Sequence, residues 1–226
     1  MRISTRPLSR ETQRRVSTSK CRALESSASK PFNSFAFGLA SAVILSGCQN
    51  ADDIIQAARF GDLQKLNDCI ESGIPVDHAD PTGETALFHV IGAGSDKAFE
   101  LLINNDANIQ VRDSLGNTTL HKAVTFGRRE FAVELIERGL DMNATNKVGA
   151  TALHYAVRSG NLDMVEFLFK KGAEVGVQDA DGNSPAEVAQ AMNGQEGLSG
   201  PMGRPISKKQ VTEIISALTK TTTTNK

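Results

Sequence analysis

The strongest constraint on the fold is an internal repeat with a period of 33 residues. Glycines that open similar segments recur at this spacing at Gly83, Gly116, Gly149 and Gly182. Each segment predicts a short helix, a Gly-containing turn and a second helix, most clearly over residues 149–172. A fixed period of this length indicates a solenoid, in which each unit packs only against its neighbours.

The second predicted helix of each unit carries three apolar columns at positions i, i+3 and i+4, which lie on one helical face. The columns hold Leu66, Phe99, Ala132 and Val165, then Cys69, Leu102, Leu135 and Leu168, then Ile70, Ile103, Ile136 and Phe169. This face is therefore expected to be buried between adjacent units.

The segments TTLH (118–121), TALH (151–154) and SPA (184–186), with Gly172-Ala173 closing a second helix, resemble the ankyrin repeat and its T-P-L-H signature. The resemblance covers roughly residues 50–220. It implies an all-α ankyrin-repeat solenoid of about five helix-turn-helix repeats with short hairpin loops. The expected repeats are 50–82, 83–115, 116–148, 149–181 and 182–219, with an inserted loop at 193–205 and a disordered tail at 221–226.

The second repeat is the least regular. Asp106 stands where Gly73, Gly139 and Gly172 close the equivalent helices. A left-handed backbone conformation is expected at this position, and Asp tolerates it less well than Gly. The sequence therefore predicts a locally weaker repeat.

Residues 1–47 are interpreted as a lipoprotein-type signal peptide, with the mature domain at 48–220. A basic, Ser/Thr-rich stretch precedes twelve apolar residues at 35–46, too few to span a bilayer. The alternative is a buried helix. The basic stretch is long for a signal, which leaves open a translation start downstream of Met1.

The sequence LSGC at 45–48 resembles the lipobox of bacterial lipoproteins. By that resemblance Cys48 is the first mature residue and carries a diacylglyceryl anchor. Gln49, in place of Asp, implies the outer membrane, with the protein facing the periplasm. Cys21 would leave with the leader, so Cys69 would stand alone as a small core residue and no intramolecular disulfide is expected.

The net charge of residues 48–226 limits the classes of partner that the chain is expected to bind. Residues 1–47 hold eight Lys/Arg and two Asp/Glu, which leaves 17 Lys/Arg against 24 Asp/Glu in residues 48–226. Nucleic acids and anionic membrane surfaces require a basic footprint, so neither is an expected partner. Membrane contact is expected only through the lipid on Cys48.

No motif predicts an enzyme, a cofactor or a metal site. His121 and His154 recur 33 residues apart and could suggest a metal, but the family resemblance implies that they are scaffold residues. One polar column also precedes the repeat glycines and fits turn hydrogen bonding better than acid–base chemistry. It consists of Asp80, Asp113, Asn146 and Asp179.

Protein binding is the function that the resemblance implies, through hairpin tips and the ends of the first helices. The residues at these positions are Arg59, Phe60, Arg112, Ser114, Leu115, Asn117, Thr125, Phe126, Lys147, Val148, Arg158, Ser159 and Gln178. Among them, Phe60, Leu115, Phe126 and Val148 are apolar and would form a hot spot. The alternative is that Phe60 and Phe126 fold back under neighbouring loops.

The expected role is a monomeric, membrane-anchored, periplasmic module that binds or stabilises a protein partner. It resembles periplasmic ankyrin proteins that support catalase-linked oxidant defence. Two alternatives remain: an immunity protein that neutralises a secretion-system toxin, and an unlipidated cytosolic or host-delivered ankyrin effector.

Overall fold

A computed structural model describes residues 48–195, 197–200 and 203–222. The expected signal peptide and the last four residues lie outside these ranges. The described residues form ten α-helices and isolated β-bridges. The helices are α1 (Asp52–Phe60), α2 (Leu63–Glu71), α3 (Ala86–Ala93), α4 (Asp96–Asn104), α5 (Thr119–Thr125), α6 (Arg129–Glu137), α7 (Ala152–Arg158), α8 (Leu162–Lys170), α9 (Pro185–Asn193) and α10 (Lys208–Thr222).

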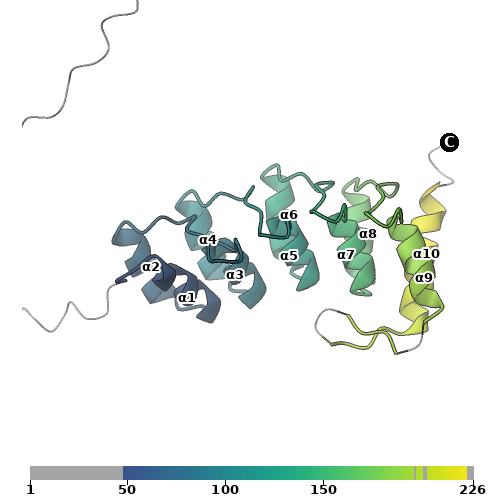
Figure 1. The fold of residues 1–226 in the computed structure, drawn as a ribbon, viewed down its shortest axis with the longest axis horizontal. Coiled ribbons are helices and arrows are strands. Elements are labelled where there is room, and N and C mark those ends of the chain that lie inside the picture. Colours follow the sequence, from purple (N-terminus) through teal and green to yellow (C-terminus); the bar gives the residue numbers. More distant parts are fainter. Residues whose placement is uncertain (1–47, 196, 201–202, 223–226) are drawn as a thin grey trace, which may run out of the picture. The chain divides into compact units, whose positions relative to one another are not determined.

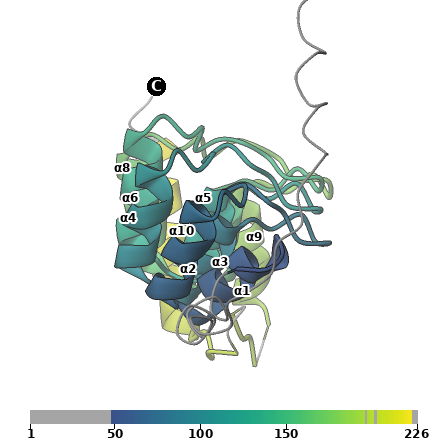
Figure 2. The ribbon, with the colours of Figure 1, turned by 90° about the vertical axis from the view of Figure 1, so that its left-hand side faces the viewer.

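The helices pair along the chain and stack in two layers (Figure 1). The first helices contact each other in the order α1, α3, α5, α7 and α9. Figure 2 shows α4, α6 and α8 in a second layer on one side, with the hairpins projecting away on the other. This arrangement confirms the all-α repeat solenoid. Among the described residues, no helix is both long and apolar enough to cross a bilayer.

Two of the three predicted apolar columns build the core between the layers, whereas the third, from Ile70 to Phe169, is only partly buried. Leu66, Leu102, Leu135 and Leu168 are fully buried. Each second helix presents such residues on one face, because i, i+3 and i+4 positions share a face. Burial of each large aliphatic side chain contributes roughly 1.5–3 kcal/mol relative to its exposure.

The last repeat contains a long loop between its two helices. The other second helices begin at residues 63, 96, 129 and 162, whereas α10 begins at Lys208. Ser207 and Gln210 cap α10, as its S-x-x-Q sequence predicts, with the Gln210 side chain accepting the Ser207 N–H at 2.9 Å. The loop folds back on the fourth repeat, so that a Cβ on Gly200 would lie 3.1 Å from the Ser159 carbonyl oxygen.

Asp106 adopts the predicted left-handed conformation, with φ of 59°. It is the only described non-glycine residue with a positive φ. Gly139 and Gly172 have the same sign of φ at the equivalent positions. The end of each second helix requires a left-handed residue at this position, and Asp106 adopts that conformation although it is not a glycine.

The two described cysteines differ from expectation. The structure joins Cys48 to Cys69 in a disulfide, with Cα atoms 5.0 Å apart. Cys69 is fully buried, as predicted, but the expectation that it has no disulfide partner is wrong. The reason is a turn before α1, where the Gln49 and Asn50 N–H groups donate to the Asp53 carboxylate at 2.7 and 3.1 Å. This turn carries the Cys48 sulfur back to α2.

Candidate functional site: the hairpin edge and the first helices

The polar column at the hairpins organises each tip. At Asp113, one carboxylate oxygen accepts the N–H groups of the residues two and four positions ahead. These are Leu115 and Asn117, at 2.9 and 2.8 Å. The same pair of bonds occurs at Asp80, Asn146 and Asp179. Since Asn replaces Asp without loss of these bonds, the column serves turn formation, which confirms its predicted scaffold role.

Backbone hydrogen bonds join successive tips. The Ser114 N–H donates to the Thr82 carbonyl at 2.8 Å, and the Lys147 N–H donates to the Leu115 carbonyl at 3.0 Å. The Ala180 N–H donates likewise to the Val148 carbonyl at 2.8 Å. The side chains of Leu115 and Val148 take no part in this stacking and remain 63% and 53% exposed.

Three of the predicted partner-binding residues hold the hairpins together. The Arg112 guanidinium donates to the Gly116 and Thr145 carbonyls at 2.9 and 2.8 Å. The Lys147 ammonium donates to the Ser114 carbonyl at 2.7 Å. The Asn117 side-chain oxygen accepts from Asn146 and from the Tyr155 hydroxyl. The polar ends of these three residues are therefore engaged in the scaffold.

The two recurring histidines also support the scaffold, as predicted. Nδ1 of His121 accepts the Thr118 N–H at 3.2 Å, so Nε2 carries the proton and faces the Ala150 carbonyl at 3.0 Å. His154 repeats the arrangement with Thr151 and the Asn183 carbonyl. Burial lowers the pKa of both rings below the ordinary value of 6.5, against the opposing effect of the carbonyl partners. Burial therefore favours the neutral form of both histidines in the folded protein.

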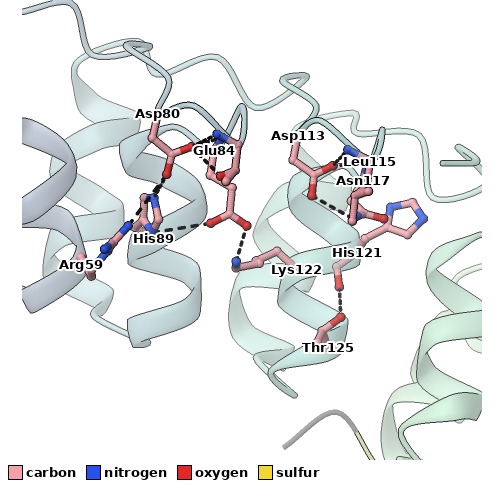
Figure 3. A network of polar contacts seen from close by, with 11 residues as sticks. Arg59, Asp80, Glu84, His89, Asp113, Leu115, Asn117, His121, Lys122 and Thr125 are labelled. Carbon is pink, nitrogen blue, oxygen red and sulfur yellow. Dashed lines mark hydrogen bonds and ion pairs between the residues drawn. The ribbon is translucent and has the colours of Figure 1, made fainter. Parts of the chain in front are cut away.

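A polar network crosses the first three repeats (Figure 3). Asp80 lies 3.0 Å from His89 Nε2 and 3.9 Å from the Arg59 guanidinium. The Glu84 carboxylate lies 3.6 Å from His89 Nδ1 and pairs with the Lys122 ammonium at 2.5 Å. Arg59 comes from α1, His89 from α3 and Lys122 from α5. The network therefore ties three consecutive first helices together.

The Asp80 carboxylate is ionised throughout the physiological range. Partial burial raises its pKa, but hydrogen bonds from Thr82, His89 and the Glu84 N–H together lower the pKa to about 2. The Asp80 side chain is only 12% exposed. It is slightly less exposed than the other carboxylate of the network, Glu84, at 17%.

Asp80, Glu84 and His89 are residue types that bind divalent cations, and their ligand atoms lie within 4.8 Å of one another. Two cationic side chains already neutralise the two carboxylates, Arg59 at Asp80 and Lys122 at Glu84. A metal ion would have to displace both. The network is better explained as an ion-pair lattice on the first helices than as a metal centre.

Some of the predicted helix-end residues line a cavity, and the others are exposed to solvent. Thr125, Phe126 and Ser159 line one cavity of about 500 Å³, together with Arg204 and Ile206 of the long loop. Phe126 is half-buried because its ring lies against Gly92 and beneath the Lys122 ammonium, 5.4 Å from the ring centroid. It therefore folds back as the alternative interpretation proposed.

Phe60 does not fold back. Its side chain is 78% exposed at the end of α1. Arg158 and Gln178 are also exposed at their positions, as is Ser114 at its hairpin tip. The structure thus brings Thr125, Phe126 and Ser159 together in one cavity, and neither Arg158 nor Phe60 is among its lining residues.

Four residues that support this edge are not among the predicted site residues. Glu84, His89 and Lys122 form the network above, and Arg128 donates to the Gly92 and Ala93 carbonyls at 3.4 and 3.2 Å. The sequence held one indication of the network, which is the position of these residues. Glu84 and His89 follow Asp80 by four and nine residues. Both belong to the second repeat, the least regular one, in which Phe88 replaces the usual histidine.

Comparison with protein families agrees with this geometry. A model of ankyrin repeats in three copies matches residues 54–146. A second model, of ankyrin repeats in many copies, matches residues 135–189. No curated protein matches the chain.

Proposed function

Because the chain belongs to the ankyrin-repeat family, we propose that it is a non-catalytic protein-binding module, anchored to the outer membrane through Cys48 and facing the periplasm. Ankyrin repeats indicate a protein–protein interaction module. The anchor, the compartment and the binding edge are the specific parts of the proposal.

The observation that carries the binding edge is the exposure of Leu115 and Val148. They occupy equivalent tips of adjacent hairpins and are 63% and 53% exposed. Backbone groups and polar side chains join these tips, so neither apolar side chain is required for stacking. Exposed apolar residues on a rigid edge are typical of a contact surface for a protein partner.

The binding edge is tested by affinity capture from an envelope fraction. Leu115→Ser with Val148→Ser is compared with the unmodified protein and with Glu166→Ser, an exposed change on α8. We expect proteins captured by the unmodified chain and by the control to be lost from the double variant. Equal capture by all three, with unchanged circular dichroism, removes the hairpin tips from the binding edge.

The LSGC sequence after an apolar stretch supports the anchor at Cys48. A diacylglyceryl thioether and a disulfide use the same sulfur, so each molecule carries one or the other. The anchored form therefore holds Cys69 as a free, buried thiol. Mass spectrometry of the Cys48 peptide from the native membrane tests this, with a lipid-modified N-terminal cysteine expected. A Cys48–Cys69 linked peptide, or Cys48 still joined to Gly47, rejects the anchor.

A further inference from the structure

The contacts that hold Cys48 beside Cys69 do not depend on the bond between the two sulfurs. The Asp53 carboxylate accepts the N–H groups of the two residues that follow Cys48, at 2.7 and 3.1 Å. The same carboxylate pairs with the Lys65 ammonium at 3.0 Å, and Lys65 lies on α2, the helix that carries Cys69. These contacts remain available when both thiols are reduced. The reduced chain therefore keeps the two cysteines close, and proximity favours reaction between them.

The Cys48 sulfur is turned into the first repeat. It lies 3.5 Å from the Lys65 carbonyl oxygen, to which a reduced thiol can donate. Cys48 is half-buried against the hydrophobic core, and Cys69 is fully buried. A sulfur that carries a diacylglyceryl group must instead reach a bilayer. Folding of the first repeat and lipid attachment therefore compete for the same atom.

The two reactions of Cys48 differ in reversibility. In lipid attachment, the Cys48 thiolate forms a C–S bond to the glycerol of a phospholipid, the C–O bond to the headgroup phosphate breaks, and the thiol proton goes to solvent. In oxidation, the Cys48 and Cys69 thiols pass two electrons and two protons to the disulfide of a thiol–disulfide oxidoreductase, which leaves as a dithiol. A thioether does not undergo thiol–disulfide exchange, whereas a disulfide can be reduced again. The disulfide thus withholds Cys48 from lipid only while oxidising conditions last.

We propose that Cys69 makes the membrane anchor sensitive to redox conditions: the Cys48–Cys69 disulfide keeps the chain unlipidated, and its reduction returns Cys48 to lipid attachment. This inference rests on the proposed anchor at Cys48 and adds its regulation. Asp53 and Lys65 are positioning residues, because they hold the turn but contribute no reacting atom. Under reducing conditions the chain becomes anchored, and a thiol oxidant leaves newly made chains without an anchor.

The test follows newly made full-length chains in a lipoprotein-processing bacterium, with and without the thiol oxidant diamide. The chain contains three cysteines, and Cys21→Ala is present throughout, so that only Cys48 and Cys69 can pair. Mass spectrometry measures which fraction of Cys48 carries lipid, which fraction is linked to Cys69 and which fraction is a free thiol. The central variant is Cys69→Ala, which removes the second thiol and leaves an apolar side chain in the core.

In untreated cells, the lipidated form should predominate with and without Cys69. Diamide should lower the lipidated fraction of the chain that has Cys69 and raise the linked peptide by the same amount, whereas Cys69→Ala should keep its lipid. Equal loss of lipid in both chains means that the oxidant acts elsewhere, and overturns the proposal. Lipid attachment that diamide does not change overturns it too, and leaves the anchor standing. Absence of lipid from both chains in untreated cells rejects the anchor and its regulation together.

A second measurement keeps both cysteines and changes only the turn. The purified full chain with Cys21→Ala is equilibrated in glutathione buffers, and the fraction of disulfide gives the effective concentration of the thiol pair. Asp53→Ala should lower this effective concentration about tenfold, because the turn is no longer held. Asp52→Ala is the matched control, since it removes the same charge from the first turn of α1 and contacts His78 instead of the turn. Equal effective concentrations in all three chains overturn the positioning of Cys48 by Asp53.

Discussion

At the scale of single residues, two buried histidines link hairpin to helix and make stability depend on pH. Burial lowers the pKa of His121 and His154 in the folded protein, so the unfolded chain binds more protons. The two histidines make their full contribution to the free energy of unfolding above about pH 7.5. This contribution declines as pH falls through their pKa in the unfolded chain, which is near 6.5. Urea unfolding at several pH values should show this loss. The double variant His121→Gln, His154→Gln should be less stable at high pH and show a flatter decline; an unchanged slope contradicts the assignment.

Asp80 offers a second test at this scale, because Asn146 makes the same turn bonds without a charge. Asp80→Asn should keep the hairpin and lose its charged contacts with Arg59 and His89. We expect a loss of about 1 kcal/mol in the free energy of unfolding. The matched change Asp113→Asn, where no ion pair exists among the described residues, should cost less than about 0.5 kcal/mol.

The pH dependence of that loss follows from the lowered pKa of Asp80, about 2. A carboxylate with a depressed pKa stabilises the folded state above its unfolded pKa and loses this effect as pH falls through the folded value. The difference between the unmodified chain and Asp80→Asn should therefore persist to about pH 4 and vanish near pH 2. A difference that vanishes already at pH 5 contradicts the network.

At the scale of elements, we predict that the end of α4 is the weak point of the solenoid. Asp106 has a φ of 59° where the equivalent helices end in glycine. Asp106→Gly should raise the free energy of unfolding by about 0.5–1 kcal/mol, since a Cβ is disfavoured in the left-handed region. Chemical denaturation measures the change, and slower amide hydrogen exchange in α4 should accompany it. Gly139→Asp should destabilise by a similar amount.

At the scale of the whole molecule, the disulfide ties the chain before α1 to the core of the first repeat. The two cysteines are 21 residues apart. In protein that carries no lipid, oxidation should stabilise the fold by about 3 kcal/mol relative to the reduced form, by restricting the unfolded chain. Thermal unfolding with and without reductant measures this. Cys48→Ala should abolish the dependence on redox state; a dependence that survives in this variant contradicts the assignment.

The family resemblance implied the scaffold role of His121 and His154. The sequence by itself determined the repeat, the helix pairs and the left-handed residue at 106. These follow from local rules, because a 33-residue period and an i, i+3, i+4 pattern are written in neighbouring residues. The family resemblance then indicated which exposed positions face a partner. It could not distinguish Leu115, whose side chain is exposed, from Arg112, whose guanidinium donates to the Thr145 carbonyl of the next hairpin.

Only the tertiary structure decided the contacts that cross repeats. The Cys48–Cys69 bond depends on a turn before α1, and the network from Arg59 to Lys122 requires three helices at once. A groove between α4 and α6 is lined by residues of both helices, among them Glu100 and Glu130. Such contacts depend on side-chain direction between elements, which periodicity does not encode.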